Sequence, residues 1–351
     1  MEIKELLQLT VEKNASDLHL AVGQPPILRI NGRLVQTDGP VLTQEKVKAL
    51  ILSLMNPMQK DQFLVNKELD FSSELAGQGR FRINAYHARG QMAAALRLLP
   101  MKIKTIGELN LLPICHQFVK LQQGLILVTG PTGHGKSTSL AAMIDEINRT
   151  RAVHIVTIED PIEYVYEKYK GIVSQREMKQ DTHSWQIALR SVLREDPDVV
   201  LVGEMRDYET IAAAITVAET GHLVFATLHT NSASQTVDRI VDVFPEHQQG
   251  QIRVQLGVIL EAVISQRLIP ALKGGRVPAC EVLLGTAAVK TAIRESKTHM
   301  IDNIIQTSGE IGMLSLEMDL ARLVKAKQIS PDEARRFSLR PGELDRLLRK
   351  L

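Results

Sequence analysis

The stretch GPTGHGKST, at residues 130–138, has the residue types and spacing that bind a nucleotide phosphate. It fits the pattern G-x-x-x-x-G-K-[ST], in which glycines allow backbone N–H groups to close around phosphate oxygens. Lys136 supplies positive charge to the β- and γ-phosphates, and the Ser137 hydroxyl is placed for Mg²⁺. The run LILVT before it and SLAAMIDEI after it provide the expected strand–loop–helix context. The predicted nucleotide-binding residues are Gly130, Pro131, Thr132, Gly133, His134, Gly135, Lys136, Ser137 and Thr138.

Acidic residues follow two other apolar runs and are candidates to act on a magnesium ion or on water. In DVVLVGEMRD, Glu204 follows Gly203, which stands where an aspartate is common. Glu204 is therefore the candidate to organise Mg²⁺ or its waters. TIEDPIE adds Glu159, Asp160 and Glu163. We expect Glu163 to act on the attacking water, because it lies beyond the strand end and can reach over the γ-phosphate. Glu159 or Asp160 could instead cap the turn before the next proline.

Two histidines, His222 and His229, flank the apolar run LVFATL and invite a metal-site interpretation. The β-branched and aromatic residues of the run favour a strand. A strand rises about 3.3 Å per residue, so the histidines would lie about 23 Å apart and on opposite faces. One zinc ion could then not bind both, although a helix would allow it. We expect His229 at the carboxyl edge of the sheet, in reach of the γ-phosphate. His222 should lie at the far end, either as a buried structural histidine or near a domain or subunit boundary.

These residues need a sheet that brings several chain segments to one edge. Four near-continuous apolar runs occur in the second half of the chain, namely LILVTG, HIVTIED, DVVLVGE and LVFATLHT. Such runs indicate strands buried on both faces, and segments of helical pattern separate at least some of them. Alternating strands and helices predict an α/β fold with a mostly parallel sheet. Each run ends in polar or acidic residues, which should therefore gather at the ligand-binding carboxyl edge.

The length of the chain, 351 residues, indicates two domains. Residues 1–100 combine a helical segment, IKELLQLTVEK, with strand-like segments such as SDLHLAVG, PILRINGRLVQ and GRFRINAY, and Asn31-Gly32 marks a hairpin turn. We expect an N-terminal α+β domain at 1–100, a linker at 101–112 and a nucleotide-binding domain at 113–351. Beyond about residue 246 we expect a helical subregion, beginning with one helix through HQQGQIRVQLGVILEAVISQRLI.

Composition narrows the class of function. The chain has 42 basic and 40 acidic residues, so its bulk charge gives no support for a nucleic-acid-binding protein. Cys115 and Cys280 are the two cysteines, and their separation fits neither a disulfide scaffold nor a structural zinc site. The N-terminus lacks the pattern of a signal peptide, and no window of about 18 apolar residues occurs. We therefore expect a cytoplasmic protein whose membrane role comes through partners.

Four motifs together resemble those of the secretion ATPase superfamily. They are GPTGHGKST as Walker A, TIEDPIEY as Asp box, LREDPDVVLVGEMRD as Walker B and AETGHLVFATLHTNSA as His box. The segments ASDLHL, GQPPILRINGRL, GRFRINAY and IRESKTHMI make the chain most similar, within that superfamily, to the type IV pilus retraction ATPases. The resemblance covers nearly the whole chain. It implies a PAS-like N-terminal α+β domain, a RecA-like P-loop ATPase core with a C-terminal helical region, and ATP and Mg²⁺ as cofactors.

The resemblance also implies roles for particular residues. Glu163 corresponds to the catalytic acid of the Asp box and Glu204 to the Walker B glutamate. His222 and His229 occupy the two His-box positions, and Lys136 completes the implied catalytic set of Glu163, Glu204 and His229. The implied magnesium ligands are Ser137 and Glu204, and the further motif residues are Glu159, Asp160, Arg206 and the N-terminal arginines Arg80, Arg82 and Arg97, which the family directs at the nucleotide, including a neighbour's.

At the level of assembly, the resemblance implies a homohexameric ring at the inner face of the cytoplasmic membrane. Its implied partner is an inner-membrane pilus platform protein, and the resemblance implies neither a nucleic-acid partner nor direct insertion into the membrane. Hydrolysis of ATP around the ring would drive pilus disassembly and twitching motility.

The chain departs from the family pattern at several positions. His134 stands where serine is usual, and since the backbone amide is the phosphate-binding group there, we expect little loss. Ser296 stands where glycine is usual. KTAIRES differs from the retraction-linked motif of the family but retains Arg294 and Glu295.

Other functions remain as alternatives. Pilus-extension and type II secretion ATPases share the motor core but usually carry a four-cysteine metal insertion, which two distant cysteines cannot build. An accessory retraction paralogue stays open. A non-hydrolysing nucleotide-binding scaffold is disfavoured by the intact Lys136, Ser137, Glu163 and Glu204, and a nucleic-acid motor would need a basic channel.

Overall fold

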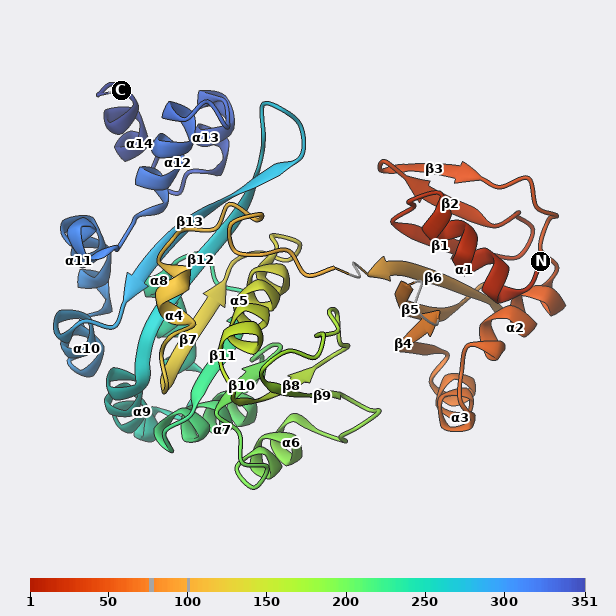
Figure 1. The fold of residues 1–351 in the computed structure, drawn as a ribbon, viewed down its shortest axis with the longest axis horizontal. Coiled ribbons are helices and arrows are strands. Elements are labelled where there is room, and N and C mark those ends of the chain that lie inside the picture. The colour runs from red at the N-terminus through yellow and green to blue at the C-terminus, as the bar shows by residue number, and fades with distance from the viewer. Residues whose placement is uncertain (76–78, 100–101, 351) are drawn as a thin grey trace. The chain divides into compact units, whose positions relative to one another are not determined.

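The computed structural model describes residues 1–75, 79–99 and 102–350. The chain forms two compact units, one of Met1–Lys102 with Pro161–Val165 and the other of Ile103–Asp160 with Tyr166–Leu351 (Figure 1). The expected boundary at residues 100 and 101 lies outside the described residues. Within the segment expected to be a linker, Ile106 is 1% exposed and packs in the core of the second unit. The division into 1–100, 101–112 and 113–351 stays a prediction.

The first unit contains an antiparallel six-stranded sheet in the order β3-β2-β1-β6-β5-β4. Asn31 and Gly32 form the two-residue loop between the paired residues Ile30 and Arg33, and their φ angles are 49° and 80°. This backbone favours Asn-Gly, so the predicted hairpin turn is confirmed. The elements are α1 (Ile3–Glu12), β1 (Asp17–Leu20), β2 (Ile27–Ile30), β3 (Arg33–Gln36), α2 (Gln44–Ser53), α3 (Pro57–Asn66), β4 (Glu68–Leu75), β5 (Gly79–Ala88) and β6 (Gln91–Leu99).

The two faces of this first sheet differ in character. Along β5, Phe81 and Ile83 are fully buried in a core shared with α1, α2 and α3. Arg80 and Arg82 alternate with them and are half-buried on the other face. This alternation is expected of a strand that is covered by helices on one face only. The strand predicted through GRFRINAY is confirmed.

The second unit contains a seven-stranded sheet in the order β13-β12-β7-β11-β10-β8-β9. The neighbours from β12 to β9 pair in parallel, and β13 pairs antiparallel with β12. The predicted α/β fold with a mostly parallel sheet is confirmed, as are its four predicted strands. The strands are β7 (Gly124–Thr129), β8 (His154–Glu159), β9 (Ile172–Glu177), β10 (Val199–Val202), β11 (Leu223–Leu228), β12 (Leu260–Pro270) and β13 (Arg276–Leu284).

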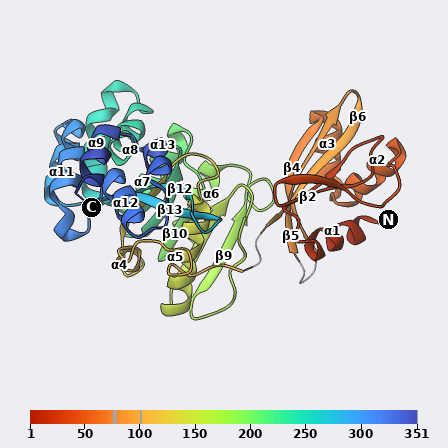
Figure 2. The same cartoon turned by 90° about the horizontal axis from the view of Figure 1, so that it is seen from above.

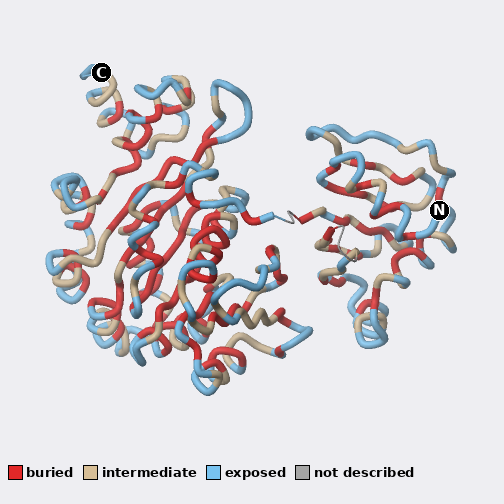
Figure 3. The backbone as a smooth tube through the Cα atoms, in the orientation of Figure 1, coloured by how far each residue is buried: buried red, intermediate tan, exposed pale blue. Residues whose placement is uncertain are grey.

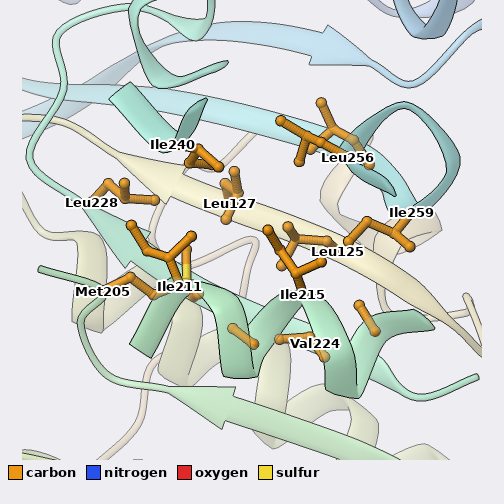
Figure 4. Close-up of a cluster of buried hydrophobic side chains, with 14 of the residues drawn as sticks. Leu125, Leu127, Met205, Ile211, Ile215, Val224, Leu228, Ile240, Leu256 and Ile259 are labelled. Atoms are coloured by element: carbon orange, nitrogen blue, oxygen red, sulfur yellow. The ribbon is translucent and has the colours of Figure 1, made fainter. Parts of the chain in front are cut away.

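Helices cover both faces of the second sheet. Along β7, Leu125 and Leu127 belong to one apolar core, and Ile126 and Val128 belong to the other. Figure 4 shows Leu125 and Leu127 among side chains of α7, α8 and α9, and Figure 2 shows α4 and α5 on the opposite side of the sheet. The central strands are accordingly buried along their length (Figure 3). Because neither face meets water, these strands are apolar throughout.

Helices separate the four predicted strands, as their sequence pattern indicated: α5 lies between β7 and β8, α6 between β8 and β10, and α7 between β10 and β11 in the sequence. Among the described residues, none of the helices combines the length and apolar character needed to cross a bilayer. The helices are α4 (Cys115–Phe118), α5 (Lys136–Thr150), α6 (Trp185–Val192), α7 (Tyr208–Glu219), α8 (Ala233–Asp242), α9 (Glu246–Ile259), α10 (Ala287–Arg294), α11 (Ile301–Thr307), α12 (Leu316–Lys325), α13 (Pro331–Phe337) and α14 (Pro341–Leu348), with short 3₁₀ turns at Thr298–Met300 and Gly309–Ile311.

The prediction of one helix through HQQGQIRVQLGVILEAVISQRLI, residues 247–269, is wrong. The helix α9 ends at Ile259, and the strand β12 begins at Leu260. Both faces of β12 are covered, so that Val263 and Ile264 are buried on opposite sides of the sheet. A strand that is buried on both faces shows the same unbroken apolar run as a buried helix, and periodicity cannot separate the two. The helical pattern predicted for the rest of the region is confirmed from α10 onward.

We expect Leu127→Ala to destabilise the second unit by about 2–5 kcal/mol, because it removes buried methyl groups from the core in Figure 4 and leaves a cavity. Val254→Ala on α9 is the matched control, since Val254 is 52% exposed and its truncation should change the free energy of unfolding by about 0.5 kcal/mol or less. Urea unfolding followed by circular dichroism measures both. Equal destabilisation by the two changes would contradict the assignment of this core.

Candidate functional site

The phosphate loop begins where β7 ends, and its backbone fits closely against β12. Gly130 has φ of 137°, and a Cβ atom there would lie 2.2 Å from the Gln266 carbonyl oxygen. A side chain is therefore excluded at this first position of the loop. The loop leads directly into α5, whose first residue is Lys136. The predicted strand–loop–helix context is confirmed, and the N-terminus of α5, where the helix dipole favours a bound anion, directly follows the loop.

Lys136 is 8% exposed and held inside the loop. Its ammonium group donates to the carbonyl oxygens of Gly130, at 2.8 Å, and Pro131, at 3.1 Å. These partners orient the ammonium group but carry no net charge. They hold the Lys136 ammonium group inside the phosphate loop, where it is suited to contact a bound anion.

His229 connects the phosphate loop to Glu204. Its Nε2 lies 2.7 Å from the Glu204 carboxylate, and its Nδ1 lies 3.3 Å from Lys136 Nζ and 3.3 Å from Thr132 Oγ1. An ammonium group can only donate, so Nδ1 must be the acceptor and Nε2 must carry the proton that faces Glu204. The ring thereby joins an acid on one side to a lysine on the other. The predicted place of His229, at the carboxyl edge beside the phosphate loop, agrees with these contacts.

Glu204 is shaped electrostatically by two partners. Its carboxylate lies 2.6 Å from Arg206 Nε and 2.7 Å from the His229 ring. Burial acts to raise the pKa of Glu204, but the contacts with Arg206 and His229 outweigh burial and hold the pKa below its ordinary value. Glu204 is therefore ionised at neutral pH and is chemically suited to bind a cation or its water shell. The neighbouring Gly203 lies close to β8, where a Cβ atom would meet the Ile158 carbonyl oxygen at 3.1 Å.

The acids after β8 occupy different surroundings. Glu159 accepts from Thr157 Oγ1 at 2.7 Å and from Gln175 Nε2 at 3.3 Å, so its carboxylate is fixed between β8 and β9. Asp160 is exposed and adds to the negative field that raises the pKa of Arg206, after the larger effect of Glu204. Glu163 is half-buried in the segment that groups with the first unit. Its predicted role at the attacking water stays a prediction.

His222 lies at the opposite end of β11 from His229, as predicted. Its Nδ1 is 3.0 Å from the Val217 carbonyl oxygen and 3.0 Å from Thr220 Oγ1, at the C-terminus of α7. Its backbone carbonyl accepts from the Gly124 N–H at the start of β7. A ring that binds the last carbonyls of a helix stabilises that helix end. His222 thus connects α7 to the sheet, with its ring at the end of the helix and its backbone carbonyl at the start of β7.

The N-terminal arginines lie on the half-exposed face of the first sheet. Arg82 on β5 is directly opposite Arg97 on β6. Arg97 Nε lies 3.0 Å from the Asp17 carboxylate, and Arg80 donates to Ser72 Oγ at 2.7 Å. The three arginines therefore form one basic area of the first unit. Their predicted action on a nucleotide stays a prediction.

Gln266, which is not among the residues predicted from the sequence, is 2% exposed and contacts the phosphate loop from β12. Its side chain donates to the His134 carbonyl oxygen at 2.8 Å and accepts from Ser139 Oγ at 2.7 Å. A polar residue inside the apolar run AVISQRLI was the available signal, but the run was interpreted as a helix. Ser137 and Thr138, in the first turn of α5, are exposed and half-buried respectively, so the Ser137 hydroxyl is open to a ligand.

The fold and the site together define a P-loop nucleotide-binding protein of the α/β class. The phosphate loop follows a central parallel strand, and a lysine, a carboxylate and a histidine meet beside it. The type II/IV secretion system protein family matches residues 2–310, and the chain belongs to that family. The family expected from the motifs is therefore confirmed.

Individual relatives are similar over nearly the whole chain. "Type IV pilus retractation ATPase PilT" of Pseudomonas aeruginosa is 49% identical over 335 residues, which cover 95% of this chain and 97% of the relative. "Type IV pilus ATPase PilU" of the same organism is 39% identical and covers 95% of this chain and 88% of its own length. The crystal structure of the pilus retraction motor PilT with bound ADP superposes with a TM-score of 0.92 at 46% identity, and 99% of each chain is covered.

We expect Arg206→Gln to raise the pKa of Glu204 toward its ordinary value, because the change removes one of the two contacts that hold it down. In the folded wild type, the stability contributed by ionised Glu204 is present above the ordinary carboxyl pKa and is lost as pH falls through the lowered one. A pH titration of ¹³C-labelled glutamate by NMR measures the shift. Arg149→Gln is the control, since Arg149 pairs with Asp145 instead. A pKa of Glu204 that does not respond to Arg206→Gln would contradict the assigned contact.

Proposed function

We propose that the chain is a P-loop ATPase that powers type IV pilus retraction. The observation that carries this proposal is the contact of one imidazole, His229, with both Glu204 and Lys136. The 49% identity to a type IV pilus retractation ATPase and the likeness to a retraction motor with bound ADP support the nucleotide and the process.

In the proposed reaction, the loop amides and Lys136 bind the phosphates of ATP and stabilise the charge that develops as the terminal phosphoryl group leaves. The Ser137 hydroxyl and the Glu204 carboxylate are oxygen donors of the kind that Mg²⁺ prefers, so they fit a magnesium site. A bound Mg²⁺ would neutralise phosphate charge. Glu163 is proposed as the base that orients the attacking water. His229 reports on the nucleotide, since it touches both the loop lysine and Glu204.

The proposed assembly is a homohexamer at the inner face of the cytoplasmic membrane, with an inner-membrane pilus platform protein as its partner. Closed rings arise from head-to-tail contacts that repeat around an axis. We propose that the nucleotides bound in the hexamer are contacted by Arg80, Arg82 and Arg97, including the nucleotide of a neighbouring copy. Their shared face on the first sheet supports a common role for them.

An accessory retraction ATPase is the second candidate. The 39% identity to a relative named as a type IV pilus ATPase, with no mention of retraction, is compatible with this alternative. The higher identity to the retractation ATPase favours the main motor.

We expect Glu204→Gln and His229→Ala each to lower kcat for Mg-ATP at least about tenfold, because each breaks the contact between the Walker B carboxylate and the loop. His222→Ala is the matched control and should act through assembly or coupling, since its ring contacts α7 instead. Phosphate release measures turnover, and size-exclusion chromatography measures the assembly. Equal catalytic loss in both histidine variants with intact hexamers would contradict the division of roles, and wild-type turnover no higher than that of Glu204→Ala would reject hydrolysis.

Deletion of the gene in its host tests the process. A retraction motor predicts excess surface pili together with loss of twitching, whereas an extension motor predicts loss of pili. Electron microscopy of surface pili and a plate assay of twitching measure both. Complementation with the wild-type chain should return the number of surface pili to normal and restore twitching. Complementation with Lys136→Ala should do neither.

A further inference from the structure

The strand β12 extends beyond the end of its neighbour β7. The ladder between them ends at the pair Thr129 and Ser265, while β12 continues to Pro270. The phosphate loop therefore occupies the place beside β12 that a longer β7 would have filled. Backbone groups of β12 that point to that side must find their partners in the loop.

Gln266 is the first connection between β12 and the loop. Its buried amide donates to the His134 carbonyl oxygen at 2.8 Å and accepts from Ser139 Oγ at 2.7 Å. One side chain thus holds the middle of the loop and the first turn of α5 together. The Gln266 backbone carbonyl lies against Gly130, so β12 also supports the start of the loop.

The side chain of His134 is the second connection. Its Nδ1 accepts a hydrogen bond from the Leu268 backbone N–H at 2.9 Å. Because a backbone N–H can only donate, Nδ1 must be unprotonated and the proton of a neutral ring must be on Nε2. The ring also lies edge-on to Phe337 of α13, with centroids 6.4 Å apart. The imidazole is therefore engaged on two sides.

We propose that His134 is a positioning residue whose neutral imidazole, acting with Gln266, fastens the phosphate loop to β12 in its nucleotide-binding shape. This inference rests on the proposed function, since it concerns nucleotide affinity at the same loop. It also assigns a role to a side chain at a position where the family resemblance gives serine.

The charges around His134 make this fastening sensitive to acid. Burial is the largest cause that lowers the pKa of His134, and Arg267 on β12, Arg276 on β13 and Lys136 on α5 lower it further. Arg276 also donates to the Gly133 carbonyl oxygen at 3.4 Å. A proton on Nδ1 would point a second donor at the Leu268 N–H and add a fourth cation. As pH falls below the ordinary histidine pKa, the folded state and the fastened loop both lose stability, because the unfolded chain binds that proton more readily.

Two substitutions distinguish the hydrogen-bond acceptor at residue 134 from the ability of its side chain to take up a proton. In His134→Asn, the amide oxygen is placed as Nδ1 is, two bonds from Cβ, and it does not titrate. In His134→Ser, the hydroxyl is one bond from Cβ and does not reach the Leu268 N–H. His134→Asn should therefore retain the fastening at every pH, and His134→Ser should lose it at every pH.

Equilibrium dialysis of the full-length chain with radiolabelled ADP tests the proposal. At about pH 8, we expect His134→Asn to bind ADP as the wild type does and His134→Ser to bind about fivefold more weakly, the loss of about one hydrogen bond. Between about pH 8 and pH 5.5, wild-type affinity should fall relative to that of His134→Asn. Hydrogen exchange should be faster at the Leu268 amide in His134→Ser than in His134→Asn.

The outcomes distinguish this inference from the proposed function. If the wild type binds ADP and all three proteins bind it equally at both pH values, the fastening by His134 is overturned while the proposed function stands. An acid-induced gain of affinity in the wild type relative to His134→Asn also overturns it. If the wild type binds no ADP, both are overturned.

Discussion

Parallel pairing of β7, β11 and β10 is the constraint on which the candidate site depends. The register joins Thr129 to Leu228, and Ala226 to Val202, so the three strands end near one edge of the sheet. The residues that follow these ends are the phosphate loop, His229 and Glu204. Lys136 and His229, which are 93 residues apart in the sequence, meet there because parallel strands have their carboxyl ends on the same side of the sheet. Backbone pairing brings these residues together, and charge and hydrogen bonding then set the positions of their side chains.

The charged side chains at this edge surround the His229 imidazole, whose tautomer is fixed by its contacts. Two backbone carbonyl oxygens orient the Lys136 ammonium group, while Arg206 and His229 lower the pKa of Glu204 and keep it ionised. His229 lies between a donor and an acceptor, so any ligand that draws Lys136 toward itself alters the partner of Nδ1. One imidazole therefore contacts both the lysine of the phosphate loop and the carboxylate that follows the neighbouring strand β10.

The antiparallel hairpin of β12 and β13 packs against the phosphate loop and supports it. Gln266 and the Leu268 N–H contact the loop through His134, and the Gln266 carbonyl leaves room only for glycine at residue 130. The segment that the periodicity analysis wrongly assigned to a helix is therefore the one that supports the loop most directly. Burial on both faces gives β12 an unbroken apolar sequence that resembles a buried helix. The same burial holds the Gln266 side chain in place against the loop.

Elements with local signals could be predicted from the amino-acid sequence alone. The glycine and lysine spacing identified the phosphate loop, the unbroken apolar runs identified the central strands, and the seven-residue offset placed His222 and His229 at opposite ends of one strand. The three-dimensional fold determines which polar atoms meet, such as those of His229 and Glu204, or of His134 and Leu268. It also decided where α9 gives way to β12. Local patterns record burial and turn chemistry, but they carry no information on partners distant in the chain, which are selected when whole strands pair and pack.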